Sequence, residues 1–327
     1  MNKIKPKVSI IGIGNVGQAI VMNLYERRVG RKLFCFGRAG GNLNGIEARI
    51  NEIKHSHNEL GPEIIPSNNP EDLSYSEILI ITAGAPRKAD QTRDDLVRTN
   101  ARVVAEWADY IKKYAPEGVV GVVTNPVAAM TGVALEVTGF PRERVFGIGP
   151  GLDASRIRTE ISEQLGLSGS HMRVYVMGDH GEKMVIPLEC ITIGGTSLED
   201  YLIGIGRGKD YKKLERDIEE KMKTASQPLV LGLGQSPWLG PAEEVANICE
   251  YVYYAPEKRK GTTSNLLCML EGEYGIKGVV GVPVVLGRRG LIKVIEMPTL
   301  NDRHKEELRE ASEHIKETTK IALDCLK

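Results

Sequence analysis

Short apolar runs, rich in β-branched residues, alternate with longer stretches of mixed apolar and polar residues through the first half of the chain. The short runs predict strands at residues 7–13, 32–36, 78–82 and 118–123. The longer stretches predict helices at residues 15–28, 45–55, 92–114 and 127–138. The last two strands are almost continuously apolar, which is typical of a parallel sheet covered on both faces. Regular alternation of strand and helix predicts a doubly wound α/β domain.

The second half of the chain has a different pattern. It predicts helices at residues 152–165, 209–224, about 240–254 and 302–326, with a Gly- and Pro-rich corner at 232–241. Strands are expected at residues 172–177, 184–187, 262–270, 278–286 and 291–297. Strands that follow one another without a helix between them indicate an α+β domain with an antiparallel sheet. We therefore predict two domains, residues 1–147 and 148–327.

Composition narrows the class of protein. Lys plus Arg and Asp plus Glu both number 43, so the net charge is +0, and neither a nucleic acid nor an anionic membrane is expected as a partner. No run approaches the ~18 uninterrupted apolar residues of a membrane span, and the N-terminus lacks the apolar core of a signal peptide. The 5 cysteines form no CxxC pair, which favours reduced thiols and a cytoplasmic location. The 6 histidines form no ligand cluster, so no metal is expected.

A glycine-rich turn follows the first predicted strand and opens the first predicted helix. Its residues are Gly12, Ile13, Gly14, Asn15, Val16 and Gly17. In this context the GxGxxG pattern lets the backbone approach a pyrophosphate, which is held at the positive end of the helix. The alternative is a tight glycine turn without a ligand. The position between strand and helix favours dinucleotide binding, and therefore a Rossmann domain.

The end of the second predicted strand bears on the choice of cofactor. A carboxylate that holds the ribose hydroxyls of NAD is expected there, but the sequence has Gly37 and Arg38. Glycine leaves room for a 2′-phosphate and arginine pairs with one, which favours NADP over NAD. The alternative is that Arg38 is a solvated turn residue that stacks on adenine, with NAD as the cofactor.

The second half carries a candidate for acid–base chemistry. His180 stands between glycines just after a predicted strand, and Asp153 and Arg156 lie three residues apart on one face of a predicted helix. A carboxylate orients and charges a histidine, while a guanidinium grips the carboxylate of a substrate. Taken singly, the Asp–Arg pair is an ordinary surface ion pair and the histidine an ordinary structural one. Their combination favours a catalytic site.

These motifs recur in one family and in the same order. The chain resembles the lactate/malate dehydrogenase superfamily, and within it the lactate-dehydrogenase-like malate dehydrogenases, from Val8 to the C-terminal helix. The matching segments are Gly12 to Gly17, Ala83 to Lys88, Thr92 to Leu96, Thr124 to Val127, Leu152-Asp153 with Arg156, and Gly178 to Gly181.

The resemblance implies a role for each residue of the acid–base site. His180 would be the acid and base, Asp153 would fix its tautomer and favour its protonated form, and Arg156 would hold the C1 carboxylate of the substrate. Asn125 would reach both cofactor and substrate, although it also suits a plain turn before a proline. The further cofactor-binding residues would be Asn100, Val123 and Thr124.

The resemblance implies that three residues act on the substrate. Arg87 lies at the family's specificity position, where a second cation favours a dicarboxylate, hence malate and oxaloacetate, over lactate. Arg93 would polarise the carbonyl from a closing lid, although it also suits the first turn of a helix capped by Thr92 and Asp95. Ser236 would line the pocket, or simply belong to a turn. A lactate dehydrogenase or a dual enzyme, and a non-catalytic dinucleotide sensor, remain as alternatives.

The resemblance also bears on assembly and regulation. It implies a homotetramer or a dimer with a place in the tricarboxylic acid cycle. The helix near residues 240–254 would pack back on the first domain. Arg158 and Arg173 would form an anion site between subunits, or would be surface arginines.

Overall fold

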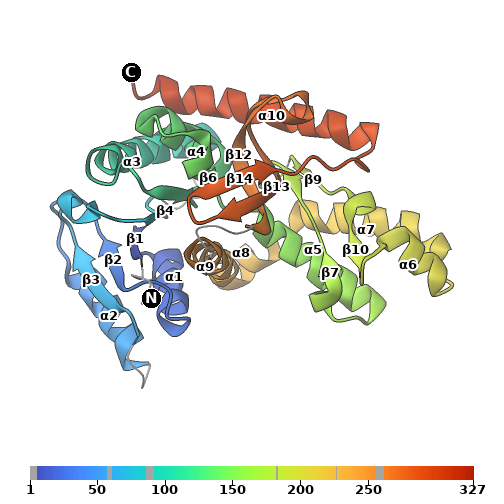
Figure 1. Ribbon diagram of the computed structural model, residues 1–327, viewed down its shortest axis with the longest axis horizontal. Coiled ribbons are helices and arrows are strands. Elements are labelled where there is room, and N and C mark those ends of the chain that lie inside the picture. Colours follow the sequence, from blue (N-terminus) through green and yellow to red (C-terminus); the bar gives the residue numbers. More distant parts are fainter. Residues whose placement is uncertain (1–5, 57–60, 86–91, 182, 226, 255–260) are drawn as a thin grey trace.

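The computed structural model describes residues 6–56, 61–85, 92–181, 183–225, 227–254 and 261–327 (Figure 1). A parallel sheet forms its first half. The strands are β1 (Lys7–Ile11), β2 (Lys32–Phe36), β3 (Glu63–Ser67), β4 (Ile78–Ile81), β5 (Val119–Val122) and β6 (Val145–Gly147). Their order is β3-β2-β1-β4-β5-β6, and each neighbouring pair is parallel. The order reverses between β1 and β4, which is where doubly wound folds bind ligands. This confirms the predicted doubly wound α/β arrangement.

Helices cover both faces of this sheet. On one face lie α1 (Asn15–Glu26), α2 (Asn44–His55) and α9 (Leu239–Tyr254), and on the other lie α3 (Arg93–Tyr114), α4 (Val127–Thr138) and α10 (Asp302–Asp324). Figure 1 shows α3, α4 and α10 together along the upper side of the sheet. Thr92 begins α3 as expected, because its side chain accepts from Asp95 N and the Asp95 side chain accepts from Thr92 N in a capping box.

The second half extends the same sheet in antiparallel fashion. β12 (Thr262–Glu271) pairs with β6, and β13 (Lys277–Gly287) pairs with β12, with β14 (Gly290–Val294) and with β8 (Met177–Gly178). A hairpin joins β8 to β9 (Met184–Val185). One hydrophobic core contains buried residues of both halves, such as Val8, Ile20, Leu267 and Val280. The antiparallel α+β character predicted for this half is confirmed.

The expected strand at residues 172–177 is wrong as a single element. β7 (Met172–Arg173) pairs with β10 (Thr192–Ile193), whereas β8 belongs to the large sheet. β10 also pairs with β11 (Thr196–Ser197). Val174 and Val176, between β7 and β8, are buried, but the chain passes from one sheet to the other there. Buried apolar residues on both sides of this point give no sign in the sequence that the strand is interrupted.

The remaining α-helices of the described residues are α5 (Pro150–Leu165), α6 (Leu198–Gly204), α7 (Tyr211–Thr224) and α8 (Gln227–Leu233). The sequence did not predict α6 or α8, and α8 occupies the start of the expected corner at 232–241. Short 3₁₀ helices lie at Pro70–Leu73, Arg142–Arg144, Gly169–His171, Leu188–Cys190, Gly208–Asp210 and Glu273–Gly275. Among the described residues, no helix is long and apolar enough to cross a membrane.

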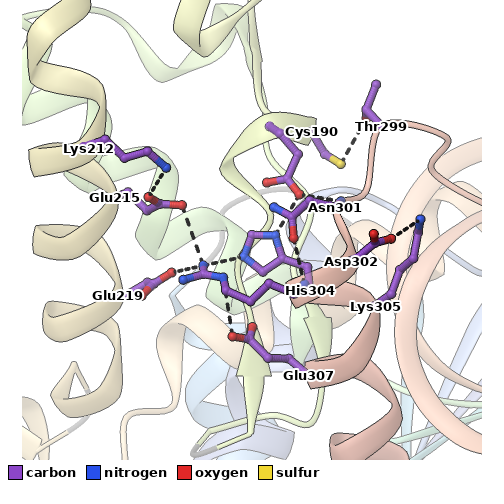
Figure 2. A network of polar contacts seen from close by, with 12 residues as sticks. Cys190, Lys212, Glu215, Glu219, Thr299, Asn301, Asp302, His304, Lys305 and Glu307 are labelled. Carbon is purple, nitrogen blue, oxygen red and sulfur yellow. Dashed lines mark hydrogen bonds and ion pairs between the residues drawn. The ribbon is translucent and has the colours of Figure 1, made fainter.

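Two groups of polar contacts connect elements that are far apart in the sequence. α9 is fastened to α1 because Arg27 Nη1 donates to Asn247 Oδ1 at 2.7 Å and to Glu250 Oε2 at 3.1 Å. A network around His304 joins α10 to α7 and to the 3₁₀ helix Leu188–Cys190 (Figure 2). His304 Nε2 lies 2.7 Å from Arg303 Nη2, which only donates, so Nε2 accepts and Nδ1–H donates to Glu189 Oε1 at 2.7 Å.

Candidate active site

The glycine turn between β1 and α1 is shaped by close packing at two of its glycines. Gly12 has φ +99°, and a Cβ there would lie 2.6 Å from the backbone N and Cα of Ala83. A Cβ on Gly17 would overlap the carbonyl oxygen of Gly12. A Cβ on Gly14 would meet no atom within 4 Å. Contacts with neighbouring protein atoms therefore explain why residues 12 and 17 are glycines, whereas the space next to Gly14 is open.

This open space suits a pyrophosphate. Gly14 caps α1 without a side-chain hydrogen bond, and the first turn of α1 contains no acidic residue, so its N–H groups and positive helix end face the opening. Asn15 Nδ2 donates to Gln235 Oε1 at 2.7 Å, so the connection between α8 and α9 lies beside the turn. The residues present fit a nicotinamide dinucleotide.

The chain reaches the surface just after β2, where an adenosine ribose is expected. Gly37 N–H donates to Ser67 O at 3.0 Å, and a Cβ on Gly37 would lie 2.5 Å from Ile46 Cδ1. The packing of α2 therefore gives a second reason for glycine, besides room for a phosphate. Arg38 is exposed, and within the described residues its side chain forms no ion pair. Its guanidinium is available to an anion.

The loops after β4 and β5 are joined by Asn100. This buried side chain accepts from Ala85 N at 2.8 Å and donates to Asn125 O at 2.7 Å. Thr124 Oγ1 donates to Ala83 O at 2.8 Å, and Val123 N–H donates to Ile81 O at 2.9 Å. Asn100 and Thr124 thus hold the two loops in place, and the exposed Asn125 side chain stands at the edge they form. Direct contact of these residues with a cofactor stays a prediction.

The structure brings His180, Asp153 and Arg156 together. Asp153 lies in the first turn of α5, and His180 lies in the turn between β8 and β9. His180 Nδ1 is 2.6 Å from Asp153 Oδ2, and Arg156 Nη1 donates to Asp153 Oδ1 at 3.1 Å. The Asp153 side chain is 1% exposed, whereas those of His180 and Arg156 are 22% and 21% exposed. A buried carboxylate therefore holds two cationic groups that both reach the surface.

The electrostatics favour the protonated form of His180. Burial lowers the pKa of the ring, but the Asp153 carboxylate raises it by charge and by hydrogen bonding, with a smaller contribution from Asp179. Arg156 opposes them, and the net effect is a pKa above the ordinary value of 6.5. Gly149 keeps the ring close to α5, because a Cβ there would lie 3.1 Å from His180 Cγ.

The remaining predicted residues are placed only in part. Arg87 lies outside the described residues, and for Arg93 the structure describes the backbone at the start of α3. Ser236 is exposed in the connection between α8 and α9, next to Gln235. It therefore lies near the glycine turn.

Arg158 and Arg173 line one cavity of about 250 Å³. The cavity also contains Glu244, and a Cβ on Gly151 would overlap the Glu244 carboxylate. Burial raises the pKa of Glu244 to about 7, despite the nearby Arg158.

Glu244 and Asp179 were not singled out from the sequence. An acid beside His180 was a local signal for Asp179, whereas Glu244 had no local signal. Within the described residues, no group of three His, Cys, Asp or Glu side chains is arranged to hold a metal.

Comparison with known proteins identifies the family. The family model for the lactate/malate dehydrogenase NAD binding domain matches residues 6–147, and that for the alpha/beta C-terminal domain matches residues 151–325. The fold and the glycine turn indicate a dinucleotide-binding protein, and the two family models place it among the dehydrogenases. The chain belongs to the lactate/malate dehydrogenase superfamily.

Individual relatives span nearly the whole chain. It is 35% identical to a malate dehydrogenase of Methanothermobacter thermautotrophicus, over 98% of each protein. Its structure resembles the malate dehydrogenase of Aeropyrum pernix, with a TM-score of 0.83, 32% identity, and coverage of 96% of this chain and 97% of that one. It also resembles the malate dehydrogenase of Cryptosporidium parvum, with a TM-score of 0.88, 29% identity, and coverage of 98% and 99%.

Proposed function

We propose that the protein is a malate dehydrogenase that interconverts malate and oxaloacetate with a nicotinamide cofactor. The observation that carries the proposal is the contact of His180 Nδ1 with Asp153 Oδ2 at 2.6 Å, with Arg156 on the other carboxylate oxygen. This site combines a proton carrier, a carboxylate that stabilises its protonated form, and a cation that can bind the carboxylate of a substrate. Relatives named malate dehydrogenase support malate as the substrate.

His180 carries the proton in this mechanism. Because Asp153 holds Nδ1, Nε2 gives a proton to the carbonyl oxygen during reduction and takes one from the hydroxyl during oxidation. When bound, the nicotinamide supplies or accepts the hydride. The raised pKa of His180 favours the charged ring, which is the form that donates a proton to a substrate oxygen. Asp153 stabilises that charge without leaving the protein interior.

Arginines orient the substrate. Arg156 uses one N–H group on Asp153, and its guanidinium retains others to bind a substrate carboxylate in a two-pronged contact. We assign carbonyl polarisation to Arg93 and binding of the distal carboxylate to Arg87, from their places in the family motifs. A second cation separates oxaloacetate from pyruvate, because pyruvate has no carboxylate to match it.

The exposed guanidinium of Arg38 supports a preference for NADP over NAD. No described carboxylate stands at the end of β2 to bind the ribose hydroxyls of NAD, and a 2′-phosphate would pair with Arg38. Arg38→Asp is expected to lower kcat/KM for NADPH by about tenfold or more and to spare NADH. Arg31→Asp is a matched control, since it makes the same charge change at an exposed residue before β2, at the opposite end of the strand.

The deciding experiment is a set of initial rates with oxaloacetate or pyruvate, each with NADPH or NADH. The proposal requires the highest kcat/KM for oxaloacetate, and the cofactor preference requires NADPH to exceed NADH. Pyruvate rates close to those of oxaloacetate would instead identify a lactate or dual enzyme. Cofactor binding without turnover of either acid would identify a dinucleotide sensor and reject the dehydrogenase.

Assembly into a dimer or tetramer forms part of the same proposal. Exposed apolar side chains follow one another on α8, at Leu229, Val230, Leu231 and Leu233, and Leu239 at the start of α9 is exposed too. Such a patch is typical of a surface covered by another protein chain. Light scattering of the purified protein gives the mass, and a monomer at assay concentrations would contradict this expectation.

A further inference from the structure

His180 contacts carboxylates from two different elements. Asp153 of α5 holds the ring, as described above. Asp179, which follows β8, contacts the backbone instead: its Oδ1 accepts from His180 N–H at 2.7 Å. The proposed function gives a role to Asp153 and none to Asp179.

The turn that carries His180 holds Asp179 firmly. Asp179 N–H donates to Lys183 O at 3.0 Å, and Met184 N–H donates to Gly181 O at 3.2 Å. Gly178 and Gly181 supply the left-handed backbone that the turn needs, with φ values of +83° and +114°. Asp179 is only 8% exposed. Its carboxylate therefore lies at a fixed position, with little water to screen it, one residue from the proton carrier.

Among the described residues, the charges that act on the His180 ring are those of Asp153 and Arg156 on α5 and of Asp179 in the turn. Lys183, also in the turn, pairs with Glu310 of α10, with Nζ 3.5 Å from Oε2. Because Asp153 bonds with both His180 and Arg156, the positive charge of Arg156 partly neutralises the carboxylate that stabilises the protonated ring. Burial and Arg156 both disfavour the protonated ring, and the negative charge of Asp179 acts against them.

We propose that Asp179 is a positioning residue for His180: its carboxylate fixes the His180 peptide group and adds a second negative charge beside the ring. The inference rests on the proposed function, because it takes His180 as the proton carrier. It adds a residue that acts through His180 and touches neither substrate nor cofactor.

The direction of the effect follows from the charge. Removing a nearby negative charge lowers the pKa of a histidine. Reduction needs the protonated ring, so the alkaline limb of its pH profile moves to lower pH. Oxidation needs the neutral ring, so the acidic limb of its profile also moves to lower pH. General structural damage lowers both rates without moving either limb.

Asp179→Asn separates charge from hydrogen bonding, because the amide oxygen still accepts from His180 N–H. We expect both limbs to move down by about 0.5–1 pH unit. The titration of the His180 ring, followed by NMR without substrate and assigned with His180→Gln, should move by the same amount. Glu160→Gln is the matched control. Glu160 is also buried, at 7% exposed, and lies on α5, but it bonds with Gln164 and Lys221.

The outcomes separate the two proposals. Equal ring titrations in wild type and Asp179→Asn, with Glu160→Gln also unchanged, overturn the role of Asp179. If Asp179→Asn does not fold, Asp179→Ser retains a hydrogen-bond acceptor without charge and decides the same question. If wild type does not turn over oxaloacetate, the malate dehydrogenase proposal fails, while the ring titration still measures the effect of Asp179 on His180.

Discussion

Glu244 is expected to make the stability of the folded protein depend on pH. The change that tests this is Glu244→Gln, which keeps the size of the side chain and removes its charge. Glu244 lies partly buried on α9, in the cavity that also contains Arg158 and Arg173. Burial raises its pKa from 4.5 to about 7, with Glu243 adding to the rise and Arg158 and Asn247 opposing it.

The sign follows from proton binding. Below about pH 4 the carboxyl is protonated in both states, and it contributes nothing. Between about pH 4.5 and pH 7 the unfolded chain releases the proton while the folded protein keeps it, so a rising pH favours unfolding. Above pH 7 the folded protein carries the full cost of a charged, poorly hydrated carboxylate. Wild type therefore loses stability as the pH rises through this window.

The magnitude comes from the same two pKa values. The gap between 4.5 and about 7, at about 1.4 kcal/mol per pKa unit, corresponds to about 3 kcal/mol. Residual exposure of the side chain to water reduces this to about 2 kcal/mol. Glu244→Gln should therefore be more stable than wild type by about 2 kcal/mol at about pH 8, and by less than about 1 kcal/mol at about pH 5.

Urea unfolding at several values between about pH 5 and pH 8 measures the difference. Glu250→Gln is the matched control, since it removes another carboxylate of α9, whose side chain is 38% exposed and pairs with Arg27. It should shift stability by about 0–1 kcal/mol without a trend in pH. A wild-type minus Glu244→Gln difference that stays constant across this range would refute the reasoning.

Three further predictions concern the site and its support. Asp153→Asn should lower kcat/KM by about 10²–10⁴-fold while leaving cofactor binding, measured by fluorescence titration, unchanged; a simultaneous loss of cofactor affinity would contradict it. Gly14→Val should fold normally but bind NADPH or NADH weakly, whereas Gly12→Val should lose stability, because only Gly12 abuts Ala83; equal thermal stabilities would argue against this distinction. His304→Ala should lower the free energy of unfolding in urea by about 2–4 kcal/mol, because it removes a fully buried side chain and one of the donors to Glu189, which still accepts from Asn301 N–H; a change below about 1 kcal/mol would show that the network in Figure 2 adds little.

Local sequence patterns predicted those helices and strands whose formation depends mainly on the residues within them. The apolar runs of β1, β4 and β5 and the capping box of α3 are local features, and they predicted the parallel sheet and its covering helices. They failed at β3, which contains Pro66 and lies at the edge of the sheet, where proline is tolerated. They also failed at α8, whose apolar residues are largely exposed and give no amphipathic signal.

The same distinction between local pattern and tertiary contact applies to the candidate site. The GxGxxG turn and the Asp153–Arg156 spacing are short-range patterns, so the sequence by itself determined them. Only the tertiary structure decided that His180 lies 2.6 Å from a carboxylate 27 residues earlier in the chain, and that Asn100 bonds with Ala85 and Asn125. The same holds for the fit of Glu244 against Gly151. Such contacts arise when α5, β8 and α9 pack around a sheet that runs through both halves, and local backbone preferences carry no information about that packing.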